Sequence, residues 1–200
     1  ATGRLDKSIR YVARELELTL PIISSNGAMV RDMLSGQLIY DEPIPPKVSL
    51  SVLSILTQID APWIMACDQD MIIFSPGNPR MEILSQRNNQ LPSADQVILI
   101  EDPDPVSLVN NGLKVYKLIV YSQSPEYLKS VAAKLADIDE ISPVFSDSSL
   151  LDIGLRGTDK GKAVQKLAEQ LGLKREQVMT AGDQENDITM LQWAGLGIAM

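Results

Sequence analysis

The fold is decided by residues 177–200, which read QVMTAGDQENDITMLQWAGLGIAM. The apolar residues at 177–181 predict a strand. After a polar turn, apolar residues at helical spacing predict a helix over 187–193, and a second apolar strand follows at 196–200. A strand, a helix and a strand joined by short links are typical of a parallel α/β unit.

A further helix leads into this unit, with its apolar residues on one face. The residues that recur at helical spacing are Ala163, Val164, Leu167, Ala168 and Leu171. Gly172 stands where such a helix ends, because glycine accepts the left-handed backbone of a C-terminal cap. The C-terminal part of the chain therefore predicts alternating helices and strands.

Toward the N-terminus the pattern becomes mixed. Helices are expected at 7–18, 47–59, 80–86 and 124–136. Asp6 is expected to cap the first of these helices, and Ser124 the last. Strands are expected at 38–40, 63–67, 71–74, 97–100, 115–121, 143–146 and 150–153, and those at 63–67 and 71–74 form a hairpin.

Three prolines within residues 41–46 indicate a domain boundary. The simplest arrangement is an α/β core formed by residues 1–45 and 150–200. A smaller domain of mixed helices and strands, residues 46–149, interrupts this core.

The composition excludes several classes of function. The chain carries 18 Lys and Arg against 26 Asp and Glu, a formal net charge of −8, so general nucleic-acid binding is not expected. The absence of histidine rules out histidine triads and histidine metal sites, and Cys67 alone cannot form an internal disulfide. No apolar run approaches the roughly 20 residues that span a bilayer, and no signal peptide is visible, so we expect a cytoplasmic protein without a membrane partner.

The loop at 182–187, Gly-Asp-Gln-Glu-Asn-Asp, joins a predicted strand to a predicted helix. Ligands of parallel α/β folds bind where the strands end, and this loop brings carboxylates there. Mg²⁺ prefers such hard oxygen ligands and takes only one or two carboxylates beside its waters. The alternative is a polar loop in which Glu185 or Asn186 only caps the next helix.

Lys160 begins the helix that precedes this unit. A lysine at a helix N-terminus opposes the helix dipole, so another charge is expected beside it, and a bound phosphate is one candidate. The alternative is a solvated side chain beside Asp159. Two shorter signals accompany it: Thr2-Gly3 precedes the first helix, and Asn26-Gly27 forms a turn.

Taken in order, these segments resemble the haloacid dehalogenase-like phosphatases of the Cof type. The residues that carry the resemblance are ATGR at 1–4, SNGA at 25–28, TDKGKA at 158–163, GDQENDITML at 182–191 and AGLGIAM at 194–200. The match brackets the whole chain. It implies a doubly wound, Rossmann-like parallel-sheet core with an inserted α+β cap domain.

The resemblance also implies Mg²⁺-dependent hydrolysis of small phosphate monoesters, such as sugar phosphates, through an aspartyl-phosphate intermediate. By similarity, Thr2 and the amide of Gly3 hold the phosphoryl group. Lys160 neutralises the charge on the phosphoryl group and on the nucleophile. Arg4 and Asn26 border the substrate pocket.

The metal site follows from the same resemblance. By similarity, Asp183 binds Mg²⁺ and Asp187 supports the metal site. Asn186 contacts the phosphate or the metal shell. A lysine and a divalent cation would give this acidic chain a locally positive site for an anionic substrate, and a carboxylate would replace histidine in proton transfer.

One part of the family pattern is missing from residues 1–200. The strand that ends in Asp-x-Asp-x-Thr, which carries the nucleophile and the acid/base, should precede Thr2 within a segment of about 30 residues. Asp102 and Asp104 imitate it, but they lie in the inserted domain and are interpreted as part of a rigid solvated loop without a firm helix after it. Asp68 and Asp70 are interpreted as a hairpin turn. We therefore expect a longer protein to be the active form.

Three alternatives stay open on the sequence. One is a narrow phosphatase of the sucrose-phosphate or mannosylglycerate-phosphate kind, with its specificity in the cap. Another is a non-catalytic protein that binds phosphorylated metabolites on the same fold. The last is an α/β scaffold whose loops carry no function. The expected partner is a small phosphorylated metabolite, and the expected assembly is a monomer or a homodimer.

Overall fold

The computed structural model describes residues 1–101 and 104–200, and the chain divides into two compact units. The first unit joins Ala1–Glu42 to Arg156–Met200, and the second is Pro43–Leu155. Within the described residues, no helix combines the length and the apolar content that crossing a bilayer needs.

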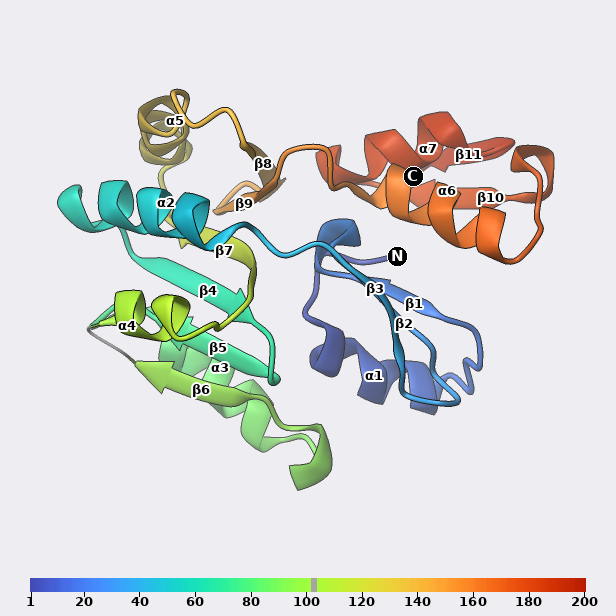
Figure 1. Cartoon of the computed structure of the whole chain (residues 1–200), viewed down its shortest axis with the longest axis horizontal. Helices are drawn as coiled ribbons and strands as arrows, with labels where there is room; N and C mark the ends of the chain where they lie inside the picture. Colours follow the sequence, from blue (N-terminus) through green and yellow to red (C-terminus); the bar gives the residue numbers. More distant parts are fainter. Residues whose placement is uncertain (102–103) are drawn as a thin grey trace. The chain divides into compact units, whose positions relative to one another are not determined.

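The first unit contains the segments drawn in blue and in orange to red in Figure 1. Its elements are α1 (Asp6–Glu15), β1 (Ile22–Ser24), η1 (Ser25–Gly27), β2 (Met29–Arg31), β3 (Leu38–Asp41), α6 (Lys160–Gln170), η3 (Arg175–Gln177), β10 (Met179–Gly182), η4 (Glu185–Asp187), α7 (Ile188–Trp193) and β11 (Leu196–Ala199).

These strands form two separate sheets. β1, β2 and β3 make an antiparallel sheet in that order, and β10 pairs with β11 in parallel. A small core joins the first sheet to α6, because Ile23, Val30 and Ala163 are buried together. The parallel β10–α7–β11 unit predicted from residues 177–200 is confirmed.

The expected doubly wound parallel sheet is found only in part within the described residues, because β10 and β11 pair in parallel but β1, β2 and β3 form a separate antiparallel sheet. β1 has β2 as its strand partner, and β10 has β11. The three residues of β1 and the three of β2 are too few to show a periodic pattern, and neither strand was predicted. Only β3 of that sheet was anticipated, at residues 38–40.

The second unit is built around one six-stranded sheet (Figure 1, cyan to yellow). Its elements are α2 (Pro46–Gln58), β4 (Trp63–Cys67), β5 (Met71–Phe74), α3 (Arg80–Asn89), η2 (Ser93–Asp95), β6 (Ile98–Glu101), α4 (Pro105–Asn110), β7 (Val115–Tyr121), α5 (Pro125–Lys134), β8 (Ile141–Asp147) and β9 (Leu150–Leu155). The strand order is β6-β5-β4-β7-β9-β8, and the predicted β4–β5 hairpin is confirmed.

Helices α2, α4 and α5 share one apolar core with this sheet. Alternate residues of β4 enter it, including Met65, which packs among side chains such as Leu56 and Leu128. Burial, followed by the charge of Asp68, raises the pKa of the Cys67 thiol to about 12. The thiol is therefore neutral at physiological pH and acts as a core residue.

Two local predictions are corrected. Asp6 does not cap α1: it lies inside the helix, buried, and accepts from Arg31 Nε at 2.7 Å. No firm helix was predicted after Asp104, but helix α4 begins at the next residue. Asp104 caps this helix by accepting from the Ser107 N–H. Asp102 and Pro103 lie outside the described residues. The predicted cap of α5 by Ser124 is confirmed.

Candidate functional site

Lys160 is the first residue of α6 and reaches across to the loop after β10. The side chain of Asp159 caps the helix by accepting from the Lys162 N–H at 2.9 Å. Lys160 Nζ donates to Asp187 Oδ1 at 2.5 Å and to Asn186 Oδ1 at 3.1 Å. The Lys160 and Asp187 side chains are only 7% and 8% exposed, so the carboxylate compensates a buried positive charge at an unfavourable end of the helix dipole.

Asp187 also holds its own loop in shape. Its Oδ2 accepts from the backbone N–H groups of Asp183 and Gln184, each at 3.2 Å. Burial by itself would raise the pKa of Asp187, but the hydrogen bond and charge of Lys160, with the two backbone donors, lower it below the usual value. Asp187 is thus an ionised carboxylate whose two oxygens are both engaged.

The same cluster includes the turn after β1 and the first residues of the chain. Asn186 Nδ2 donates to Asn26 Oδ1 at 3.1 Å. Gly3 lies against Asn26, because a Cβ on Gly3 would be 2.6 Å from that oxygen. Backbone hydrogen bonds join Thr2 to Ile23 and Asn26 at 2.9 and 3.1 Å. The structure therefore brings Gly3, Asn26, Lys160, Asn186 and Asp187 together.

Three predicted residues lie at the edge of this cluster. Thr2 Oγ1 accepts from the Arg4 N–H at 3.2 Å, and Arg4 is exposed. Asp183 is also exposed, at the end of β10. Their predicted roles in substrate and metal binding stay predictions.

Ser25 was missed by the sequence reasoning. It is 2% exposed, its φ of 50° lies in the left-handed region, and its hydroxyl has no hydrogen-bond partner within the described residues. Asn26 follows with a φ of 57°. Strained backbone and an unsatisfied buried hydroxyl are typical of functional sites. A serine at the end of a strand, directly before Asn-Gly, was the available signal.

In the loop at 182–187, the exposed Asp183 carboxylate at the end of β10 is the one predicted to bind a metal ion. Asp187 is occupied by Lys160 and by backbone donors, whereas the exposed Asp183 carboxylate accepts a long contact of 3.4 Å from Gln184 Nε2. Among the residues that the structure describes, no three acidic or cysteine side chains form a metal cluster. One hard carboxylate fits Mg²⁺, which keeps several waters and often takes other oxygens from its substrate.

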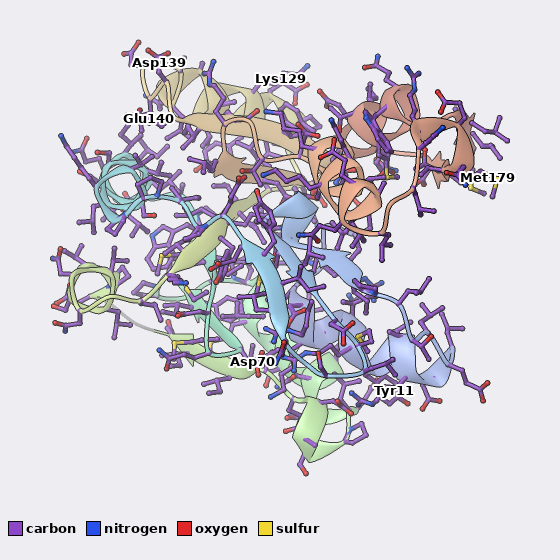
Figure 2. All side chains as sticks on the ribbon, turned by 45° about the vertical axis from the view of Figure 1, so that its right-hand side comes forward. Tyr11, Asp70, Lys129, Asp139, Glu140 and Met179 are labelled. Carbon is purple, nitrogen blue, oxygen red and sulfur yellow. The ribbon has the colours of Figure 1, made fainter. Side chains whose placement is uncertain are left out.

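A groove lies between β1 and β10. Its volume is about 340 Å³, and it is lined by Ala1, by Pro21, by Ile23 of β1, by residues 178–181 and by the apolar face of α6. Met179, labelled in Figure 2, is 65% exposed. The Thr2 backbone donates to the Ile23 carbonyl and accepts from the Asn26 N–H. The groove is thus bordered by the edge strand of each of the two sheets, β1 and β10.

Gly27 couples the turn after β1 to the start of α6. Its φ is +100°, and a Cβ there would lie 2.4 Å from the Asp159 carbonyl oxygen. Gly27→Ala is expected to lower the free energy of unfolding by about 2–4 kcal/mol, because the cost of backbone strain and the cost of displacing the segment before Lys160 add together. The matched control is Gly36→Ala, at a φ of +71° with open space around it, where only about 1 kcal/mol is expected. Urea unfolding measures both, and equal losses would contradict the close approach.

Comparison with known proteins gives a family model and longer relatives. The model described as haloacid dehalogenase-like hydrolase matches residues 1–200. The chain is 25% identical over 218 residues to phosphatase YwpJ of Bacillus subtilis, covering all of this chain and 75% of that protein. It is 24% identical over 201 residues to pyridoxal phosphate phosphatase YbhA of Escherichia coli, covering 100% and 73%.

The fold also matches solved structures. The structure of a haloacid dehalogenase-like hydrolase from B. subtilis superposes with a TM-score of 0.82 at 23% identity, covering all of this chain and 75% of the other. At that identity the likeness concerns the fold alone. The sequence in hand spans about three quarters of the length of these proteins.

Proposed function

Because the chain belongs to the haloacid dehalogenase-like hydrolase family, we propose that the full-length protein is a Mg²⁺-dependent phosphatase of small phosphate monoesters. The membership confirms the resemblance drawn from the sequence motifs. The observation that carries the proposal is the convergence on Lys160: its amine contacts Asn186 and Asp187, and Asn186 contacts Asn26. A buried lysine held in place by neighbouring polar side chains is suited to a phosphoryl dianion.

The chain's own residues bind and orient the phosphoryl group in this proposal. Lys160 faces its oxygens as a fixed positive charge, since Asp187 and Asn186 already hold the amine in place. Thr2, through its hydroxyl, and Gly3, through its amide, donate to the same oxygens, and Ser25 adds a further hydroxyl. Asn26 and Arg4 border the bound ester. Phosphoryl transfer depends mainly on such alignment and charge neutralisation.

Asp183 is the proposed ligand of Mg²⁺, and Asn186 contributes to the metal shell or to phosphate binding. Asp187 supports this site indirectly, because it fixes the backbone of Asp183 and Gln184 through Oδ2. When bound, Mg²⁺ supplies positive charge to the phosphoryl oxygens.

The nucleophile is proposed to lie on a strand that precedes Ala1. The groove between β1 and β10 supports this, because a strand seated there would lie beside the edge strand of each sheet and could join the two. Ala1 itself lines this groove, so a preceding segment would reach it directly. In this arrangement the first unit is a doubly wound core and Pro43–Leu155 is its inserted cap.

The proposed reaction has two steps, formation of an aspartyl phosphate and its hydrolysis. An aspartate oxygen from the preceding segment bonds to phosphorus while the bond to the ester oxygen breaks, and a second carboxyl group gives its proton to the departing alcohol. Water then attacks phosphorus and gives a proton to that second carboxylate. The bond between the aspartate oxygen and phosphorus breaks, which releases phosphate and restores both carboxyl groups.

The test uses the full-length protein with Mg²⁺ and a panel of sugar phosphates, pyridoxal phosphate and related esters, with released phosphate as the readout. Hydrolysis of several small esters is expected, and it should stop on addition of EDTA. Turnover of one disaccharide phosphate alone would favour the narrow sugar phosphatase. Binding without turnover would favour the non-catalytic protein. If the protein neither binds nor hydrolyses these esters, the proposal is wrong.

A further inference from the structure

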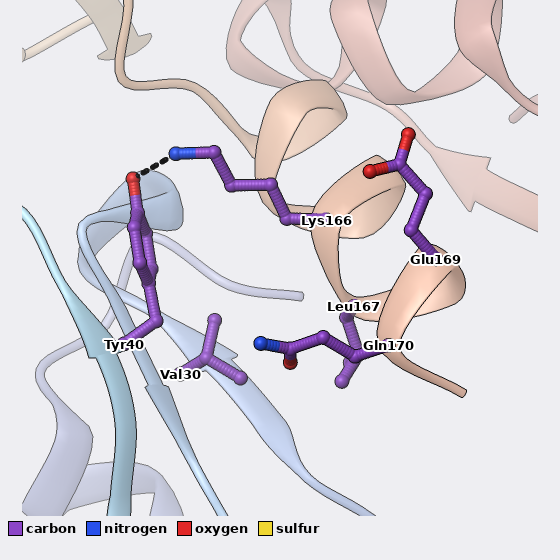
Figure 3. Close-up of a pocket in the computed structure, with 6 residues that line it drawn as sticks. All are labelled: Val30, Tyr40, Lys166, Leu167, Glu169 and Gln170. Carbon is purple, nitrogen blue, oxygen red and sulfur yellow. Dashed lines mark hydrogen bonds between the residues drawn. The ribbon is translucent and has the colours of Figure 1, made fainter. Parts of the chain in front are cut away.

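Glu42 holds together side chains from two distant parts of the first unit. Its Oε2 accepts from Thr158 Oγ1 at 2.6 Å, and its Oε1 accepts from Lys166 Nζ at 2.9 Å. Lys166 Nζ also donates to the Tyr40 hydroxyl at 2.5 Å, the contact drawn in Figure 3. We call these four residues the Glu42 cluster. It lies at the rim of a cavity of about 490 Å³ between Val30, Tyr40 and α6.

The Glu42 carboxylate is ionised near neutral pH. Burial by itself would raise the pKa of Glu42, but hydrogen bonds from Thr158, Tyr40 and Lys166 lower it to about 2. A carboxylate with each oxygen bonded to a different donor has a fixed orientation. The hydrogen bonds of the Glu42 cluster therefore do not depend on a change in the ionisation of Glu42 near neutral pH.

The place of this connection in the chain gives it meaning. Glu42 is the last residue before the chain leaves the first unit, and Arg156 is the first residue after it returns. Thr158 stands two residues before Lys160. One carboxylate thus ties the outgoing segment to the segment that begins α6, across 116 residues of sequence.

The start of α6 is fixed from other sides as well. The Asp159 side chain caps the helix, and the Asp159 carbonyl packs against Gly27. The Gly161 N–H donates to Thr189 Oγ1 at 3.1 Å, which ties α6 to α7. The bond from Thr158 to Glu42 completes this set on the side of the returning chain. Lys160 therefore projects from a backbone held on both sides of it.

We propose that Glu42 is a positioning residue for Lys160. By holding Thr158 with one carboxylate oxygen and Lys166 with the other, Glu42 fixes the first turn of α6, so that the Lys160 amine meets Asn186 and Asp187. The kinetic consequence rests on the proposed phosphatase function. A displacement of about 1 Å in a catalytic group can lower the rate by up to about 100-fold. We therefore expect loss of Glu42 to lower kcat and to leave substrate affinity nearly unchanged.

The experiment compares variants of the full-length protein on para-nitrophenyl phosphate with Mg²⁺. Glu42→Ala and Thr158→Val are each expected to lower kcat by about 10- to 100-fold and to change KM by less than about twofold. The double variant should be no worse than the poorer single one, because both changes remove the same bond. Glu169→Gln is the matched control: Glu169 lines the same cavity, is exposed, and pairs with Gln165 instead.

The outcomes are separable. Unchanged kcat in Glu42→Ala, additive losses in the double variant, or a kcat loss in Glu169→Gln as large as that in Glu42→Ala would each overturn the positioning role. If the wild-type protein hydrolyses nothing, the proposed function fails, and NMR of the Lys160 amine decides the positioning role alone. An amine signal protected from exchange in the wild type and lost in Glu42→Ala supports it, and a signal unchanged by the substitution overturns it.

Discussion

Lys160→Met in the full-length protein is expected to lower kcat at least about 1,000-fold, because it removes the positive charge that faces the phosphoryl group. It should also lower the free energy of unfolding by about 3 kcal/mol, since the ionised Asp187 carboxylate, 8% exposed, would be left without its cation. Phosphate release measures the first effect, and urea unfolding measures the second.

Two further variants separate catalysis from folding. Lys162→Met removes an exposed lysine from the same helix and should change both quantities little. Adding Asp187→Asn to Lys160→Met should restore at least half of the lost stability, because no unpaired charge remains buried. The double variant should stay inactive. If the double variant recovered phosphatase activity as well as stability, Lys160 would be only a structural partner of Asp187.

The second large effect is expected at Asp183. Asp183→Asn should lower kcat/KM about 100-fold at a fixed Mg²⁺ concentration and raise the half-saturating Mg²⁺ concentration at least about tenfold. The Asp183 side chain is exposed, and among the described residues its carboxylate makes a long contact to Gln184 and no other side-chain hydrogen bond. Without metal, the free energy of unfolding should therefore change by less than about 0.5 kcal/mol.

Glu185→Gln is the matched control for Asp183. Glu185 is an exposed acid two residues away in the same loop, and its substitution should leave the Mg²⁺ dependence close to that of the wild type. Thermal unfolding adds a test without turnover: Mg²⁺ should raise the Tm of the wild type and of Glu185→Gln, but not that of Asp183→Asn. Equal losses in both variants would point to net loop charge rather than to a ligand at Asp183.

The residues proposed for the chemistry could be named from the sequence because their motifs are local. Gly182 to Asp187 stand together between a strand and a helix, and Lys160 stands at a helix start. The elements that place them were harder to predict. β1 and β2 have three residues each, too few for an apolar repeat, and the role of Ser25 depends on a left-handed φ that no composition reveals.

Asp6 and Asp104 show where local signals fail. Asp6 precedes an amphipathic stretch and is predicted to cap it, but its carboxylate accepts a hydrogen bond from Arg31 of β2. Asp104 sits between prolines and reads as loop, yet it caps α4. A short polar side chain has several possible partners, and tertiary packing selects among them.

Periodicity and motifs reside in neighbouring positions, so the order of the C-terminal helices and strands, the family resemblance and the candidate residues could all be predicted from them. The contacts of Lys160 with Asn186 and Asp187, of Asn186 with Asn26 from 160 residues away, and of Glu42 with Thr158 emerge from the folded chain. Such contacts arise when β1, α6 and the loop after β10 pack together. Burial selects those partners, and no single segment carries that information.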